Sequence, residues 1–228
     1  MIAVLDEIKT RGYWEVAVRP GQFKRDRLAF SALDVALSSA TVHFRGWDFP
    51  HFSRNDRIAR GDDFIEQESR WEHHLEVWRF FQSGQCIVLT GMAHDWRDRS
   101  KWWPADEDWR PGDRIGVGEV LYRYSEILEF AWRLMSRVPG DDDVLVSATL
   151  NGLKGRHLVM DDPSRWFWPS EHPASISTFA RKARLSREDL DRTRRDIAAT
   201  WASELFERFD KNISATVLRD WQDKFWRG

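Results

Sequence analysis

The chain has 228 residues, of which 42% are hydrophobic and 32% are charged, so it can bury a full core and is neither disordered nor fibrous. Its net charge of −2 excludes a general electrostatic attraction to nucleic acid or anionic membranes. No stretch approaches the roughly 18 apolar residues of a membrane span, and Asp6, Glu7 and Lys9 interrupt the N-terminus where a signal peptide is apolar. We therefore expect a cytoplasmic protein without membrane association.

The single cysteine, Cys86, excludes an intrachain disulfide and thiolate-built metal sites. Its apolar neighbours predict a buried thiol that is not a nucleophile. The seven histidines include no HxH or HxxxH pair, and we expect no metal and no cofactor. Fourteen tryptophans are the strongest compositional anomaly, and we expect most of them in the core and some at a recognition surface.

The N-terminal third of the chain is predicted as strand, helix and strand. Alternating apolar residues predict a strand at 13–19, which Pro20 ends. Helical spacing of leucine and alanine predicts a helix at 28–39, and a β-branched and aromatic run predicts a strand at 41–47. A short strand is expected at 64–68.

The middle of the chain contains one ambiguous segment and two clear ones. Residues 71–82 fit both a period of two and a helical period, and we predict a helix because Glu, His, Leu and Arg dominate. A buried strand at 85–92 and a central helix at 119–137 follow from apolar patterning. Between them, the polar, tryptophan-containing residues 94–113 are predicted to form a functional loop.

The C-terminal part is predicted as a hairpin followed by helices. Asn151-Gly152 is a strong turn signal, so residues 144–150 and 156–160 are expected to pair. A helix is predicted to begin near Ser175 or Ser177, and a second at Ser186, with Asp189 three residues after the cap.

These elements predict an α+β fold in which a mixed β-sheet is covered by helices and followed by a helical C-terminal portion. We expect a sheet domain at 1–165 and a helical segment at 166–228 packed on it, or one single domain.

The best candidate site is the segment 45–51, at the end of a predicted strand, because it combines a cation, an anion, an indole and an imidazole. Packing of the aromatic rings, with Asp48 capping the turn and pairing with Arg45, is the structural alternative. If the strand end and the end of the next helix converge, the binding residues are Arg19, Arg45, Trp47, Asp48, His51, Gln82 and Gln85.

Three segments, RGYWEVAVRP at 11–20, RGWDFPH at 45–51 and WRFFQSGQ at 78–85, resemble a family of uncharacterised bacterial proteins. The resemblance covers roughly residues 11 to 96. It implies a bacterial, cytoplasmic setting and supplies no catalytic residue.

No catalytic set is evident, and Trp and Arg are in excess, so we expect a non-catalytic binding or accessory protein that recognises a protein partner or a small anionic ligand. One alternative is a DNA-binding regulator, because residues 179–190 resemble a helix-turn-helix within a basic helix pair at 176–209. Its phosphate contacts would be Arg181, Arg184, Arg187 and Arg192. A second alternative is a metal-dependent hydrolase of nucleic acid or nucleotides that uses Asp48, Glu66 and Glu68.

Overall fold

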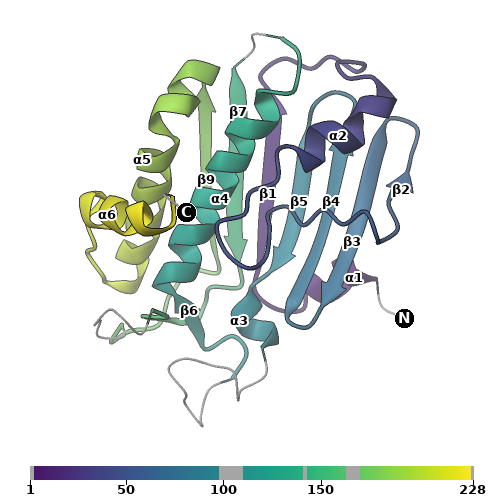
Figure 1. Cartoon of the computed structure of the whole chain (residues 1–228). Helices are drawn as coiled ribbons and strands as arrows, with labels where there is room; N and C mark the ends of the chain where they lie inside the picture. Colours follow the sequence, from purple (N-terminus) through teal and green to yellow (C-terminus); the bar gives the residue numbers. More distant parts are fainter. Residues whose placement is uncertain (1–2, 98–109, 141–142, 163–169, 227–228) are drawn as a thin grey trace.

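A computed structural model describes residues 3–97, 110–140, 143–162 and 170–226. Its main feature is a seven-stranded, fully antiparallel sheet in the order β2-β3-β4-β5-β1-β7-β9 (Figure 1). The strands are β1 (Tyr13–Pro20), β2 (Ala59–Arg60), β3 (Phe64–Trp71), β4 (His74–Phe81), β5 (Cys86–Gly91), β7 (Val144–Asn151) and β9 (Thr178–Leu185). A separate parallel pair joins β6 (Arg114–Gly116) to β8 (His157–Val159).

Most of the helices cover one face of the sheet (Figure 1). Alternate residues of the strands point to that face, so Trp14, Val16 and Val18 of β1 are fully buried, while Glu15 between them and Arg19 after them are exposed. The covering helices are η1 (Phe30–Ala32), α2 (Leu33–Ser38), α4 (Val117–Met135), α5 (Arg187–Phe206), η3 (Glu207–Phe209) and α6 (Ala215–Trp226). The short α1 (Val4–Ile8) packs on the opposite face, and α3 (Ala93–Trp96) follows β5.

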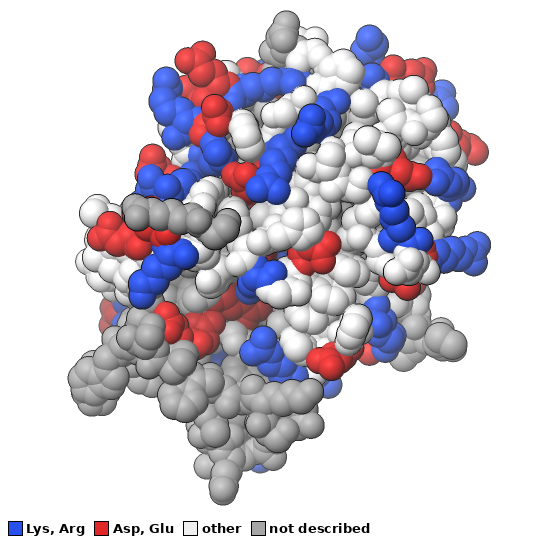
Figure 2. Space-filling view, viewed as in Figure 1, with Lys and Arg blue, Asp and Glu red and all other residues white. Residues whose placement is uncertain are grey.

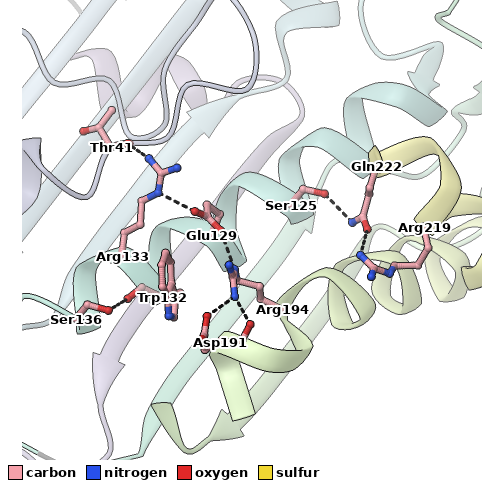
Figure 3. A network of polar contacts seen from close by, with 10 residues as sticks. All are labelled: Thr41, Ser125, Glu129, Trp132, Arg133, Ser136, Asp191, Arg194, Arg219 and Gln222. Carbon is pink, nitrogen blue, oxygen red and sulfur yellow. Dashed lines mark hydrogen bonds and ion pairs between the residues drawn. The ribbon is translucent and has the colours of Figure 1, made fainter. Parts of the chain in front are cut away.

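The long helix α4 carries polar side chains into the interior, and two of them, Ser125 and Glu129, bond the C-terminal helices (Figure 3). Glu129 accepts hydrogen bonds from Arg133, at 2.8 Å, and from Arg194 of α5, at 2.7 Å. Gln222 of α6 donates to the hydroxyl of Ser125 at 2.9 Å. Because these donors come from three helices, the polar network fixes how α5 and α6 lie on α4.

Several expectations from the sequence are confirmed. The fold class is α+β with helices at the C-terminal end, and strands form close to 13–19, 64–68 and 85–92. The central helix is present, and the Ser186 side chain caps α5 by accepting a hydrogen bond from the Asp189 backbone N–H. Cys86 is a free, buried cysteine. No helix in the described ranges is long and apolar enough to cross a membrane.

Two predictions for the first half of the chain are wrong. Residues 71–82 do not form a helix; they contain the end of β3 and all of β4, joined by a tight turn in which Glu72 has a φ of 49°. The apolar residues of this segment follow the period of two, because β4 lies between β3 and β5 and its side chains alternate between the two faces of the sheet. Residues 41–47 form no strand of the sheet; only Val42 pairs, with Phe49, in an isolated bridge. The helix predicted at 28–39 is reduced to η1 and α2.

The second half of the chain also departs from prediction. Residues 144–150 and 156–160 do not pair with each other, because β7 lies between β1 and β9 while β8 joins β6. No helix begins at Ser175 or Ser177; residues 178–185 form β9, whose eight residues pair with β7. Residues 178–185 are rich in good helix formers, but their backbone hydrogen bonds are made with β7. Pairing within the sheet therefore overrides the local helix propensity.

The sheet and the C-terminal helices share one hydrophobic core that includes Trp14, Tyr124 and Phe206. Since β9 belongs to the stretch 166–228 and forms a sheet edge, that stretch contributes both a strand and helices. Residues 98–109 of the predicted loop and 163–169 lie outside the described residues.

Candidate functional site

The segment 45–51 contributes side chains to two cavities. The first, which we call the α4 pocket, has a volume of about 440 Å³ beside the N-terminal end of α4 and is lined in part by Arg45. The second, which we call the edge groove, has a volume of about 880 Å³ beside β3 and is lined in part by Trp47 and His51. The predicted segment therefore connects the two concave regions.

One wall of the α4 pocket is apolar. Tyr122 of α4 stacks on Phe225 of α6, with ring centroids 4.1 Å apart. Leu121, Met160 and Trp221 line the pocket beside them. These side chains meet here because the amphipathic α6 lays its apolar stripe against α4.

The opposite wall is polar and is organised by Asp161, which follows β8. Its Oδ1 accepts a hydrogen bond from the Gly118 N–H at 2.6 Å, and its Oδ2 accepts one from the Glu119 N–H at 2.8 Å. The carboxylate thus satisfies two of the free amides in the first turn of α4. The approach requires glycine, since a Cβ on Gly116 would lie 2.0 Å from Asp161 Oδ2.

Glu119 is ionised at the base of this wall. Its carboxylate forms an ion pair with Nδ1 of His94, and His94 Nε2 lies 4.0 Å from Asp161 Oδ2. Burial alone would raise the pKa of Glu119, but the charge and hydrogen bond of His94, with smaller contributions from Arg45 and Arg123, lower this pKa to about 2. The lowered pKa means that the Glu119 carboxylate is held in its ionised form beside His94.

A chain of charged side chains leads from the half-buried Arg45 at the α4 pocket through buried residues towards the edge groove. Arg45 donates two hydrogen bonds to Glu126, at 2.6 and 2.8 Å, and Arg123 lies 3.2 Å from the same carboxylate. Beyond Arg123, Glu76 of β4 is fully buried and accepts a hydrogen bond from the His51 N–H at 2.5 Å. Burial raises the pKa of Glu76 to about 7, although Arg123 opposes the shift.

The edge groove has an aromatic wall built around Trp47. The indole is stacked between His51, at 3.9 Å, and His74, at 4.2 Å between ring centroids. Asp48 holds His51 by a 2.6 Å hydrogen bond to Nδ1, and this bond raises the pKa of His51. Burial, together with the nearby charge of His73 and Arg123, lowers the pKa of His74 to about 3.

The structure separates the predicted binding residues into two groups. Arg45, Trp47, Asp48 and His51 lie together, near the first residue of β4. Gln82 and Gln85 belong to the β4–β5 turn, where the Gln82 side chain donates to the Leu28 carbonyl and the Gln85 carbonyl accepts from the Phe81 N–H.

Arg19 lies at the same end of the sheet as that turn, because the preceding Val18 pairs with Cys86, the first residue of β5. Eight residues of β4, roughly 25 Å at about 3.3 Å per residue, separate the two groups. The strand end and the predicted helix end therefore do not converge.

The carboxylates of the predicted metal site point to different sides of the sheet. Asp48 bonds His51 on the helix-covered side, where the neighbouring Gln67 side chain bonds the backbone of Ser53. Glu66 and Glu68, with the opposite parity to Gln67, point away, and Glu66 pairs with Arg79 at 2.6 Å. In the ranges that the structure describes, no group of three or more His, Cys, Asp or Glu could hold a metal ion.

The predicted helix-turn-helix is a strand followed by a helix, and its four arginines have partners within the chain. Arg181 pairs with Glu204, and Arg184 pairs with Asp143 at 2.7 Å. Arg187 donates to backbone carbonyls at the end of α4 and just beyond it, and Arg192 pairs with Asp189. On the helical face, the described acidic and basic side chains are interspersed (Figure 2).

Sequence reasoning did not find His94, Glu119, Asp161, Glu76 or Glu126. Their signal was weak, since each is brought into the candidate site only by partners distant in the chain. One clue was available: Glu119, Arg123 and Glu126 recur at i, i+4 and i+7, interleaved with the apolar face of the central helix. Charges at such spacing inside an apolar stripe indicate a buried ionic network.

No family model, curated protein or solved structure matches this chain. The resemblance of its first half to a bacterial family stays a prediction.

Proposed function

We propose that this protein binds a small anionic ligand with an apolar or aromatic body in the α4 pocket and acts as a binding or accessory protein. A volume of about 440 Å³, with an apolar wall and a few convergent polar groups, is typical of small-molecule sites. The charged side chains of the pocket that have no ion-pair partner indicate which charge the ligand carries.

The lining of the α4 pocket contains both acidic and basic side chains. The carboxylates of Glu119, Asp161 and Asp162 have partners, as does the guanidinium of Arg45. Arg97 and Lys224 also line the pocket, and neither side chain has an ion-pair partner among the described residues. These two cations are the observation that supports an anionic ligand, because a carboxylate or phosphate group would supply the counter-charge.

Phenyl phosphate tests this proposal because it carries both an anionic group and an aromatic ring. Inorganic phosphate represents the anionic group alone, and benzyl alcohol represents the aromatic ring without the charge. We expect isothermal titration calorimetry to detect phenyl phosphate binding that is tighter than binding of either fragment. The reason is that the apolar wall and the cations act on the same molecule only in the complete probe. Binding of benzyl alcohol equal to that of phenyl phosphate would contradict an anion site.

Charge reversal identifies the site. Arg97→Glu and Lys224→Glu are each expected to weaken phenyl phosphate binding by about tenfold or more, which corresponds to the loss of one charge-assisted contact. The matched controls are Arg54→Glu and Lys154→Glu, which reverse exposed charges outside the pocket lining and leave binding unchanged. Equal weakening by all four variants would show a non-specific charge effect and overturn the proposal.

A further inference from the structure

The outer edge of β3 is only half covered. The two-residue β2 pairs with Ile65 and Glu66, and beyond it the lower half of β3 has no neighbouring strand among the described elements (Figure 1). The edge groove runs beside this open half and is lined by Glu68, Ser69 and Arg70. An open strand edge is a template for pairing with another strand.

The free backbone groups of this edge belong to Glu68 and Arg70. The Phe64 carbonyl accepts from the Gly61 N–H, so the backbone groups of Phe64 point outwards. Outward-pointing residues recur every second position in an antiparallel strand, which places the N–H and C=O of Glu68 and Arg70 on the same open side. Both residues are exposed, and no backbone hydrogen bond engages these groups in the described part of the chain.

We propose that a second copy of this chain pairs with the open half of β3, antiparallel and about a two-fold axis at Ser69. In this register Glu68 lies opposite Arg70 of the second copy, and Arg70 lies opposite its Glu68. Each of these pairs exchanges two backbone hydrogen bonds, and both bring opposite charges together on one face of the joined sheet. Arg70 also bonds Glu7 of its own chain at 2.9 Å, but its side chain remains 48% exposed.

Two further side chains fit this register. Ser69 is small and uncharged, and on the two-fold axis it lies opposite Ser69 of the second copy, so no bulky or charged side chain separates the two strands there. Trp71 is 60% exposed at the end of the same edge, and the second copy would cover it. A shift by two residues in either direction instead places Glu68 or Arg70 opposite its own copy, which like charges disfavour.

The other sheet edge does not offer this complementarity. On β9, a two-fold axis near the middle of the strand places either Arg181 or Lys182 opposite itself. Basic residues on an edge strand are a common protection against self-pairing. The β3 edge therefore accepts a second copy, and the β9 edge repels one.

Sedimentation velocity across a range of protein concentrations tests the proposal by charge reversal and complementation. The wild type is expected to dimerise with increasing concentration. Glu68→Arg alone and Arg70→Glu alone each create two like-charge pairs, so each should raise the dimer dissociation constant about tenfold or more. An equimolar mixture of the two variants restores two opposite-charge pairs and is expected to form a heterodimer close to wild-type strength.

Lys182→Glu on the β9 edge is the matched control and should leave dimerisation unchanged; circular dichroism confirms that every variant is folded. A wild type that stays monomeric at the highest attainable concentration overturns the proposal. It is equally overturned by single variants that dimerise like the wild type, or by a mixture no stronger than its components.

Discussion

Asp95→Ala is expected to lower the free energy of unfolding by about 3–5 kcal/mol, because it leaves a buried guanidinium without its counter-ion. Asp95 and Arg156 form an ion pair whose side chains are 1% and 2% exposed. The carboxylate also accepts hydrogen bonds from the Gly12 N–H at 2.9 Å and the Gly112 N–H at 3.0 Å. One side chain thus joins the start of β1, α3, the segment before β6 and the turn after β7.

Urea unfolding followed by tryptophan fluorescence measures this loss. Asp143→Ala is the matched control: it removes the carboxylate of an exposed pair with Arg184, and its cost should stay below about 1 kcal/mol. The double variant Asp95→Ala, Arg156→Met should recover part of the stability, since no buried charge is then unpaired. A loss for Asp95→Ala no larger than that for Asp143→Ala would show that the buried pair does not hold these segments together.

Glu76→Gln is expected to make the protein more stable than the wild type above pH 7 and to flatten its stability between about pH 4.5 and 7. Burial raises the pKa of Glu76 from 4.5 to about 7. A raised pKa means that the native state binds the proton more tightly than the unfolded state. The stability that this group contributes is therefore fully present below about pH 4.5 and is lost as the pH rises through 7.

The shift in pKa corresponds to about 3 kcal/mol, which is the expected change in the difference between variant and wild type from pH 4.5 to pH 8. Glutamine keeps an oxygen that can accept the hydrogen bond of the His51 N–H. Because Asp48, His51 and Arg123 also face Glu76, the comparison is made as a difference at each pH, which removes titrations common to both proteins.

Glu15→Gln, on an exposed position of β1, provides the control for this experiment and should leave the pH profile unchanged. Parallel profiles for Glu76→Gln and the wild type would mean that the pKa of Glu76 is not raised in the native state. In that case Arg123 and the other groups near Glu76 would stabilise the carboxylate at least as much as burial disfavours it.

The part of the candidate site that sequence reasoning found is the local part. Asp48 and His51 are three residues apart and hydrogen-bond to each other, and Trp47 stacks on the same imidazole. The rest depends on contacts between distant residues: Arg45 and Glu126 are 81 positions apart, and Asp161 reaches Gly118 from 43 positions away. No spacing rule connects such residues before the sheet and α4 bring them together.

The sequence by itself determined those elements whose signals are contained within a few residues. The alternation of β1, the apolar run of β5, the continuous apolar face of α4 and the Ser186 cap were each readable in this way. Only the tertiary structure decided that residues 71–82 and 178–185 are strands and which side chains share the α4 pocket. The reason is physical: a strand's hydrogen bonds and a pocket's charges are satisfied by residues far along the chain, so local preference alone does not specify them.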